Sequence, residues 1–192
     1  MYEMYFDLGL QVVQVAKRGK NPIGVEWQNR AATSAEQIEQ WVEDGYNIGV
    51  ILGPPSEIID VELDSPEAEE AWNKLNLECW TPTFRGKRGL HRLFRMPAGL
   101  IRKTVVKPHG IECRIGNLLG PDGQPRACQS VFPPSVHESG HQYQWVEGMS
   151  IDDFNGEFME LPAILFQMIN DESCHITSKG LSLIHISEPT RR

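Results

Sequence analysis

Short apolar runs of strand length recur between residues 47 and 146, and they set the strongest limit on the fold of this chain. Each run has the length and the alternation of apolar and polar residues typical of a β-strand. The runs lie at 47–53, 57–63, 90–96, 110–116, 127–132 and 142–146. Because helical patterns separate several of them, the sequence predicts an α/β or α+β fold with one central sheet.

Helix signals stand before, between and after these runs. Ser34 is a typical N-cap residue, and Gln37 three positions later completes a capping-box pattern. Ser65 and Pro66 predict a second helix start, because proline fits the first helical position and acidic residues follow in the first turn. Two further helices are expected, at 2–10 and 161–170.

The 192 residues fit one domain with trailing segments. We expect the domain at 1–150 and a C-terminal helical segment at 151–180 that leads to a further region downstream. No apolar run approaches the ~20 residues that span a bilayer. The N-terminus also lacks the basic, apolar and cleavage regions of a signal peptide. A cytoplasmic protein without a membrane partner is therefore expected.

The last twelve residues, LSLIHISEPTRR at 181–192, are kept out of this argument. They resemble the conceptual translation of a transposon-type sequencing adapter. The sequence therefore predicts that the natural protein continues past about residue 180 and that this chain derives from an assembly fragment. A genuine C-terminal tail is the alternative.

The chain has four cysteines, Cys79, Cys113, Cys128 and Cys174, without a C-x-x-C pair. Cys113 and Cys128 lie in strand-like runs, where a reduced cysteine acts as a small core residue. A disulfide framework is not expected in such a chain. His137 and His141 have a spacing compatible with zinc, but the two cysteines are predicted to face the core, so we expect no zinc site.

Charge is distributed unevenly along the chain. The formal net charge of −8 argues against a general nucleic-acid coat, because affinity for phosphate comes from lysine and arginine. Residues 85–107 nevertheless contain no acid and eight basic residues, Arg85, Lys87, Arg88, Arg92, Arg95, Arg102, Lys103 and Lys107. Such a segment can attract a polyanion locally, and a solvated charged face has the same composition. Charge alone leaves both interpretations open.

Two acids, Asp60 and Glu62, alternate with apolar residues in the run 57–63. In a strand, residues i and i+2 project from one face, so both carboxylates lie side by side while Val61 points to the core. Burying two like charges without a partner is costly, which favours a cation such as Mg²⁺ or Mn²⁺ between them. A solvent-facing pair on an edge strand is the alternative.

A third acid, Glu112, shares one face of the run 110–116 with Arg114. Together they form either a salt bridge or a metal-binding carboxylate beside a phosphate-binding arginine. Arg88 and His91 begin the run 90–96 inside the basic segment, where arginine and glycine suit close approach by a triphosphate.

Ser135 and His137 follow two prolines at the end of a strand-like run. The prolines fix the backbone, and both side chains could present hydrogen-bond donors. A turn with a purely structural role would have the same sequence.

In their order along the chain, these motifs resemble the bifunctional primase/polymerase N-terminal domain of the archaeo-eukaryotic primase superfamily. The resemblance covers most of residues 5–147, through GKNPIGVEWQ, ATSAEQIEQW, YNIGVILG, IIDVELDSPEA, TPTFRGKRGLHRLFR, GIECRIG and SVFPPSVHESGHQYQW. It implies a primase-type α/β (α+β) fold, with a central mixed sheet of RNA-recognition-motif character and a smaller N-terminal α/β part. Family members often have Asp-x-Arg where this chain has Glu-Cys-Arg, and small residues where it has Arg-Gly-Leu before the histidine.

The resemblance also implies a function, template-directed nucleotidyl transfer in the replication of a plasmid, prophage or virus. Asp60, Glu62 and Glu112 would hold two divalent ions, Mg²⁺ or Mn²⁺, and His91 would complete the catalytic set and contact the incoming nucleotide. Other residues would bind the nucleoside triphosphate: Arg88, Arg114, Asn47 with Gly49, Ser135 and His137. The single-stranded DNA template and its primer would contact Arg85, Lys87, Arg92, Arg95, Arg102, Lys103 and Lys107 through phosphates. A fused or associated helicase is a further expected partner.

Two other functions stay open at the level of sequence. A metal-dependent nuclease or phosphoesterase also uses clustered carboxylates, but it attacks with water and needs no nucleotide pocket. A non-catalytic replication module that binds single-stranded DNA would tolerate the loss of Asp60. Binding of a deoxynucleoside triphosphate and the effect of Asp60→Ala distinguish these functions.

Overall fold

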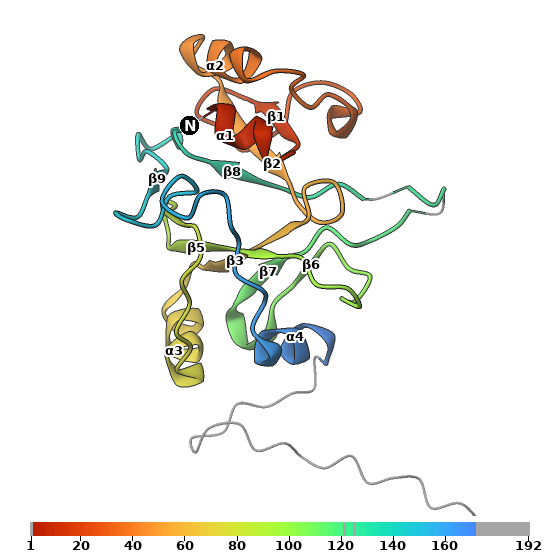
Figure 1. Ribbon diagram of the computed structural model, residues 1–192, viewed down its shortest axis with the longest axis vertical. Helices are drawn as coiled ribbons and strands as arrows, with labels where there is room; N and C mark the ends of the chain where they lie inside the picture. The colour runs from red at the N-terminus through yellow and green to blue at the C-terminus, as the bar shows by residue number, and fades with distance from the viewer. Residues whose placement is uncertain (1, 121, 125, 172–192) are drawn as a thin grey trace, which may run out of the picture.

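The structure is a computed structural model that describes residues 2–120, 122–124 and 126–171 (Figure 1). The expected adapter-derived tail, Cys174 and the end of the expected C-terminal segment lie outside these residues.

The first of two sheets has three antiparallel strands in the order β1-β2-β8. They are β1 (Val12–Val15), β2 (Asn47–Ile51) and β8 (Gln129–Phe132). In the central strand, Val50 lies opposite Val12 on one side and Ser130 on the other. A strand from late in the sequence therefore completes a sheet that the N-terminal part begins.

The second sheet has six antiparallel strands in the order β6-β7-β3-β5-β4-β9. They are β3 (Ile58–Leu63), β4 (Thr83–Arg85), β5 (Leu90–Arg95), β6 (Val105–Val106), β7 (Glu112–Arg114) and β9 (Gln144–Trp145). The strand β3 lies inside this sheet, between β7 and β5, and every one of its residues is buried. A position with strands on both sides shields the polar groups of β3 from solvent.

The expected α+β class is confirmed, but two antiparallel sheets replace the single mixed sheet. Parallel pairing within the described residues is an isolated bridge between Arg95 and Glu160. The chain leaves the first sheet at Gly53, which has a φ of 81° and pairs with Ile58. This turn sends β2 and β3 into different sheets. The apolar pattern within each run predicts a strand, but it does not predict which sheet the strand joins. The strands β4 and β6, of three and two residues, are too short for an alternating pattern that would predict them from the sequence.

Among the described residues, four α-helices flank the sheets: α1 (Tyr2–Asp7), α2 (Ala35–Glu43), α3 (Pro66–Leu75) and α4 (Ala163–Asn170). Two 3₁₀ turns, η1 (Trp27–Asn29) and η2 (Pro108–Gly110), lie in connections. The predicted N-caps are present, because Ser34 Oγ accepts a hydrogen bond from Gln37 N and Ser65 Oγ accepts one from Ala68 N. The Gln37 side chain accepts from Thr33 N, one residue before the cap. Both helices therefore begin where their polar caps predict.

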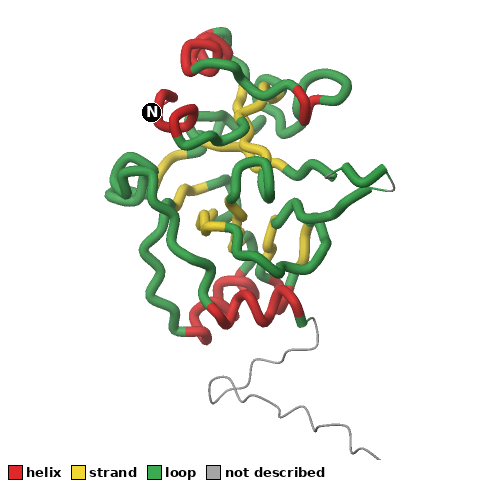
Figure 2. Tube along the Cα trace, turned by 45° about the vertical axis from the view of Figure 1, so that its right-hand side comes forward, coloured by secondary structure: helices red, strands yellow, loops and turns green. Residues whose placement is uncertain are grey.

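The sheets are stacked along the long axis of the molecule, with helices at both ends. Figure 1 shows α2 beyond the three-stranded sheet and α3 with α4 beyond the six-stranded sheet. The view in Figure 2 shows the same order, with strands in the middle and helices at the two ends. No helix in the described part of the chain combines the length and hydropathy needed to span a bilayer.

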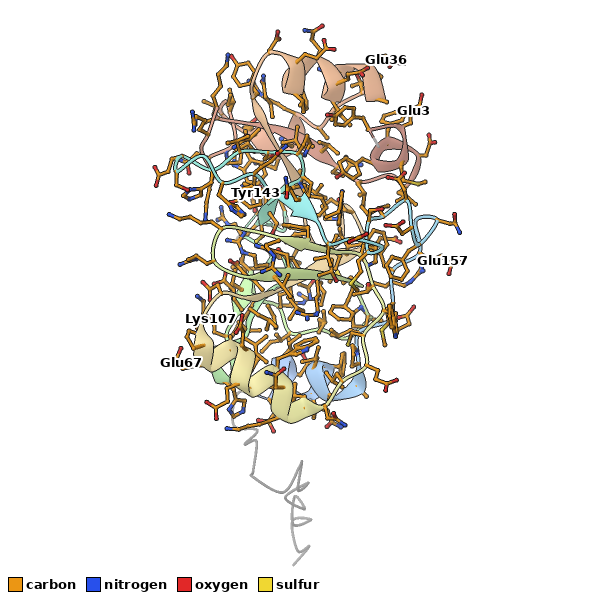
Figure 3. The ribbon with its side chains drawn as sticks, turned by 90° about the vertical axis from the view of Figure 1, so that its left-hand side faces the viewer. Glu3, Glu36, Glu67, Lys107, Tyr143 and Glu157 are labelled. Carbon is orange, nitrogen blue, oxygen red and sulfur yellow. The ribbon has the colours of Figure 1, made fainter. Side chains whose placement is uncertain are left out.

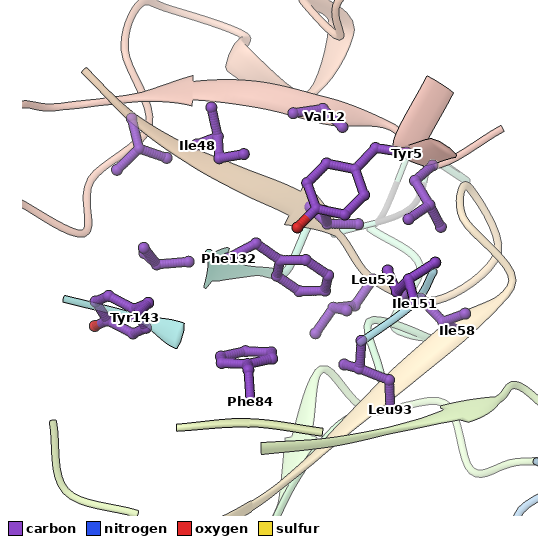
Figure 4. Close-up of a cluster of buried hydrophobic side chains, with 14 of the residues drawn as sticks. Tyr5, Val12, Ile48, Leu52, Ile58, Phe84, Leu93, Phe132, Tyr143 and Ile151 are labelled. Atoms are coloured by element: carbon purple, nitrogen blue, oxygen red, sulfur yellow. The ribbon is translucent and has the colours of Figure 1, made fainter. Parts of the chain in front are cut away.

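Two apolar clusters hold this stack together. Between the sheets, Phe132 packs on Phe84 with ring centroids 5.1 Å apart, and Leu93 and Ile48 belong to the same cluster (Figure 4). Beneath the six-stranded sheet, the second cluster joins one face of β3 to α3 and α4 through Ile59, Val61, Trp72, Leu165 and Met168. Burial of these side chains drives the stacking. The apolar cluster fills only part of the space between the sheets, and a polar site lies beside it.

Candidate active site

Charged side chains from three neighbouring strands form a cluster on the inner face of the six-stranded sheet. Glu62 of β3 lies opposite His91 of β5 on one side and opposite Glu112 of β7 on the other. Asp60, two residues earlier, lies opposite Arg114. Directly paired residues, and residues two apart in a strand, share a face of the sheet. The alternation predicted for β3 and β7 therefore brings together the acids that the sequence singled out.

Asp60 is fully buried at the centre of this cluster. Its Oδ2 accepts a hydrogen bond of 2.5 Å from Ser130 Oγ of β8 and lies 2.8 Å from His91 Nδ1. Its Oδ1 has no hydrogen-bond partner among the described residues. A buried carboxylate oxygen without a partner is costly, and a bound cation would supply what Oδ1 lacks.

His91 is fixed by stacking as well as by Asp60. Its ring lies parallel to that of Phe84, with centroids 4.4 Å apart and an interplanar angle of 7°. Burial lowers the pKa of His91, but Asp60 and Glu62 outweigh this effect and raise the pKa above 6.5. A Cβ at Gly86 would come within 2.7 Å of His91 Nε2. Glycine at this position therefore leaves room beside the ring.

Glu62 lies between the other two acids of the cluster, and both repel it. Burial raises the pKa of its carboxyl above 4.5; His91 opposes the rise, and Asp60 and Glu112 add to it. Its carboxylate oxygens lie 3.7 Å from His91 Nε2 and 3.9 Å from Arg114 Nε. These distances are longer than hydrogen bonds, so the charge of Glu62 is only partly compensated.

Glu112 is compensated more completely. Its carboxylate accepts a hydrogen bond of 2.9 Å from Arg114 Nε and pairs with Lys107 Nζ. Burial alone would raise the pKa of Glu112, but the hydrogen bonds from Lys107 and Arg114 outweigh it and lower the pKa. Arg114 also donates from Nη1 to the carbonyl of Gln129 at 2.6 Å. This arginine thereby links the acids of one sheet to the backbone of the other.

A cavity of about 480 Å³ opens over the cluster. Side chains of both sheets and of three connecting segments line it: Lys20, Asn21, Glu62, Lys87, Arg88, His91, Glu112, Arg114, Gln129, Ser130, Val131, His137, Glu138 and Tyr143. Figure 3 shows Tyr143 at the level between the sheets and Lys107 farther toward α3. The cavity has carboxylates on its floor and several basic groups around them, which suits an anionic ligand held together with a cation.

Four of the residues predicted to bind nucleotide line this cavity, namely Arg88, His91, Arg114 and His137. Arg88 Nη2 lies 2.8 Å from Asp64 and 3.9 Å from Glu62. His137 is half-buried, and its Nδ1 lies 3.0 Å from Ser139 Oγ. The side chains that the sequence placed in three separate motifs therefore share one cavity.

Asn47 and Ser135, also predicted to bind nucleotide, are buried and bonded to backbone. Asn47 Nδ2 donates to the carbonyls of Gly19 and Val136, and its Oδ1 accepts from Val136 N. Ser135 Oγ accepts from Ile48 N and donates to Ile48 O. Gly49 lies in the same strand as Asn47, and a Cβ there would come within 2.2 Å of Gln129 Oε1. These residues hold loops in place beneath the cavity.

The residues predicted to bind DNA are spread over different surfaces. Lys87 lines the cavity, and Lys107 contacts Glu112. Arg92 points to the opposite face of the sheet, where its guanidinium lies 4.6 Å from the centroid of the Trp72 ring. Arg95 pairs with Glu160 at 3.0 Å. Of the others, Arg85 and Arg102 are exposed and Lys103 is half-buried. Alternation within β5 divides what is a continuous basic segment in the sequence.

Several cavity residues were not singled out from the sequence. Ser130, Gln129 and Tyr143 reach the cavity from strand-like runs in which neither their type nor their spacing marks them. Lys20, in the loop KRGKN after β1, carries the one signal that could have been noticed, a local excess of basic residues. Their positions depend on how the two sheets stack, which the sequence pattern does not encode.

The donor set of the cluster fits hard divalent cations. Three carboxylates and no sulfur converge, and carboxylate oxygens are the preferred ligands of Mg²⁺ and Mn²⁺. In the described ranges no three His, Cys, Asp or Glu side chains are already arranged around a common point, because Lys107 and Arg114 hold Glu112. The alternative zinc ligands are separated, since Cys113 packs beneath the six-stranded sheet and Cys128 packs between the sheets.

Comparison with known protein families gives a match over most of this chain. Residues 3–163 match the family model of the bifunctional DNA primase/polymerase, N-terminal domain. The chain belongs to the Prim-Pol family. A search of curated proteins finds no match. Membership assigns the domain to DNA primase/polymerase-type replication, with DNA and nucleotides as its general substrates, and to a family of nucleotidyltransferase-type enzymes.

Proposed function

We propose that this Prim-Pol domain catalyses template-directed nucleotidyl transfer, and that Asp60, Glu62 and Glu112 hold two divalent ions, Mg²⁺ or Mn²⁺, for the reaction. The observation that carries the proposal is the alignment of Glu112, Glu62 and His91 across three adjacent strands, beneath a cavity with basic side chains around it. Bound ions would lower the pKa of the attacking 3′-hydroxyl and neutralise the charge on the leaving pyrophosphate.

The buried oxygen of Asp60 is central to this proposal. Ser130 and His91 both bind Oδ2, which fixes the carboxylate plane and leaves Oδ1 as the ligand atom. Glu62 would contribute a second carboxylate, and its repulsion from Asp60 and Glu112 would be relieved by cations. Glu112 would exchange the contact with Lys107 for a metal ligand role. Lys107 is exposed and can move away at little cost.

His91, Arg88 and Arg114 would act on the nucleotide phosphates. Asp60 and Phe84 hold the His91 ring in one orientation, and the raised pKa of His91 favours its cationic form. Charge placed in advance around a transferred phosphoryl group supplies much of the rate in this class of reaction. In this arrangement the carboxylates hold the ions and the basic residues hold the substrate.

The template and most of the primer would lie outside the cavity, on exposed basic side chains such as Arg85 and Arg102, and the 3′ end of the primer would reach the ions. Contacts of this kind bind phosphates without reading sequence. An associated helicase and a role in replicating a plasmid, prophage or virus belong to this proposal as its biological setting.

The test is synthesis on a single-stranded DNA template by the full chain, with and without an annealed primer, with labelled nucleoside triphosphates and Mn²⁺ or Mg²⁺. The Asp60→Ala/Glu62→Ala double variant should make no product. The matched control is Glu39→Ala/Glu43→Ala, which removes the same charge from exposed positions on α2 and should leave synthesis unchanged.

Three results would contradict the proposal. Synthesis that survives in the double variant would remove the carboxylates from the mechanism. Metal-dependent shortening of the template without synthesis would indicate a nuclease. A folded wild-type chain that binds DNA but neither binds nor incorporates nucleoside triphosphates would indicate a DNA-binding module.

A further inference from the structure

Four basic side chains line the cavity, and they come from three separate segments. Lys20 lies in the loop after β1, Lys87 and Arg88 lie in the turn between β4 and β5, and His137 lies in the loop after β8. The pKa of His137 is lowered by slight burial and by the nearby charges of Lys87 and Lys20. The three segments therefore bring basic groups close together, where they would attract a bound anion.

Within this group, the two lysines, Lys20 and Lys87, carry positive charge that no acidic side chain of the described residues compensates by an ion pair. Glu138 also lines the cavity and raises the pKa of His137, but its effect is smaller than that of the two lysines. Arg88 is shared between Asp64 and Glu62. Two lysines thus face the cavity without a protein partner.

Asn47 explains how the two loops come to lie side by side. Its side chain bonds to the carbonyl of Gly19, next to Lys20, and to both backbone groups of Val136, next to His137. Asn47 is 2% exposed, so these hydrogen bonds are protected from water and hold firmly. One buried amide therefore fixes the distance between two basic residues that are far apart in the sequence.

The backbone of the Lys20 loop is tied down at two more points. Gln129 Nε2 donates to the Lys20 carbonyl at 2.8 Å, and Ala16 N donates to the Asn21 carbonyl at 2.9 Å. The Gln129 side chain passes over Gly49, where any Cβ would obstruct it. The backbone of the loop is therefore a built part of the cavity wall, and the Lys20 side chain is left to meet a ligand.

We propose that Lys20 is a nucleotide-binding residue that contacts the triphosphate of the incoming nucleotide. This inference rests on the proposed nucleotidyl transfer. Lys20 shares a cavity of a few hundred Å³ with Glu62 and Glu112, a size suited to a small ligand rather than to a DNA strand. Lysine binds phosphate as a mobile point charge, so it can follow the polyphosphate from across the cavity while Arg88 and His91 hold it near the carboxylates.

The experiment compares Lys20→Ala, Lys20→Arg and Lys17→Ala in the full chain. Lys17 is the matched control, because it lies in the same loop but its ammonium sits 4.6 Å over the Tyr46 ring and does not line the cavity. Binding of dATP and of ATP is measured by calorimetric titration, with and without Mn²⁺. Binding of a labelled single-stranded oligonucleotide is measured in parallel.

Lys20→Ala should weaken dATP and ATP binding at least about tenfold, as expected for loss of a charged hydrogen bond. Lys20→Arg should restore most of the affinity, and Lys17→Ala should match wild type. Oligonucleotide binding should be the same in all four proteins. Weakened nucleotide binding in Lys20→Ala would support the inference even if the wild-type chain synthesised no product. A lack of product would count against the proposed function alone.

Unchanged nucleotide affinity in Lys20→Ala would overturn the inference and leave the carboxylate site standing. Loss of oligonucleotide binding with normal dATP binding would also overturn it, because Lys20 would then contact a DNA phosphate. Equal losses in Lys17→Ala and Lys20→Ala would reduce the effect to general loop charge and would overturn it as well.

Discussion

The two faces of β3 (Ile58–Leu63) differ sharply in chemistry. On the face toward α3 and α4, Ile59 and Val61 pack in an apolar cluster. On the face toward the other sheet, Asp60 and Glu62 lie among charged groups. Glu62 lines the cavity, and Asp60 is buried beneath it. Both faces are buried, so exposure does not distinguish them. The difference teaches that one strand can anchor the fold and carry the candidate chemistry, because its two faces are independent.

The largest expected effects come from separate substitutions of two adjacent residues, Ile59 and Asp60, that point to opposite faces of β3. Ile59→Ala should lower the free energy of unfolding by about 2–5 kcal/mol, because it leaves a cavity among buried side chains. Asp60→Asn, which keeps the shape of the side chain, should instead reduce nucleotidyl transfer at least about 100-fold. Denaturant unfolding and primer extension per folded molecule measure the two effects.

Val61→Ala is the control for the apolar face, and it should follow Ile59→Ala in both measurements. The comparison breaks down if Ile59→Ala impairs extension as strongly as Asp60→Asn after correction for the folded fraction. It breaks down equally if Asp60→Asn unfolds the protein.

The next effect concerns Ser130, which binds Asp60 from the opposite sheet. Ser130→Ala should lower the extension rate about tenfold, because a charge-assisted hydrogen bond holds the Asp60 carboxylate in position. The concentration of Mn²⁺ required for half-maximal rate should rise. A lower rate with an unchanged Mn²⁺ requirement would mean that Ser130 acts on something other than the metal ligand.

A smaller effect, on stability, should appear with Glu62→Gln in the presence of a chelator. The pKa of Glu62 is raised in the folded protein, so its contribution to stability is fully present below pH 4.5 and is lost as pH rises through the folded pKa. The variant should lack this loss and gain stability relative to wild type as pH increases. Thermal unfolding of both proteins from pH about 4 to about 8 measures the difference. A difference that does not vary with pH would contradict the raised pKa.

The smallest effect distinguishes basic residues on the two sides of the sheet. Arg92→Met removes a contact with the Trp72 ring and should cost about 0.5–1 kcal/mol of stability, without changing affinity for single-stranded DNA. Arg85→Met should do the reverse and reduce the salt dependence of DNA binding by about one phosphate contact. Reduced DNA binding in Arg92→Met would assign the helix-bearing face to DNA as well.

These comparisons also show what the sequence could and could not predict. Alternation is a local property, so it correctly placed Asp60, Glu62, Glu112 and Arg114 on one side of their strands. The caps Ser34 and Ser65 were predictable for the same reason. Contacts that join the two sheets were not, because no local pattern records which runs are stacked on one another.

Hydrogen-bond partners were the other limit of the sequence. Asn47 and Ser135 have the residue types of a binding pocket, but the structure has their polar atoms bonded to backbone. The basic segment was recognised from composition, and strand alternation then divided it between two faces. Composition identifies which groups are present, and tertiary structure decides what each one meets.

The helix α4 has a practical consequence for anyone who shortens this chain. The family match ends at residue 163, where α4 begins, yet Leu165, Met168 and Ile169 complete the apolar layer beneath the six-stranded sheet. Asn170 also receives a hydrogen bond from Ile101 N and donates one to the Gly99 carbonyl. A truncation at residue 163 would remove α4 and expose the apolar cluster beneath the six-stranded sheet, which would favour aggregation. Expression of the domain should therefore retain residues up to at least Asn170.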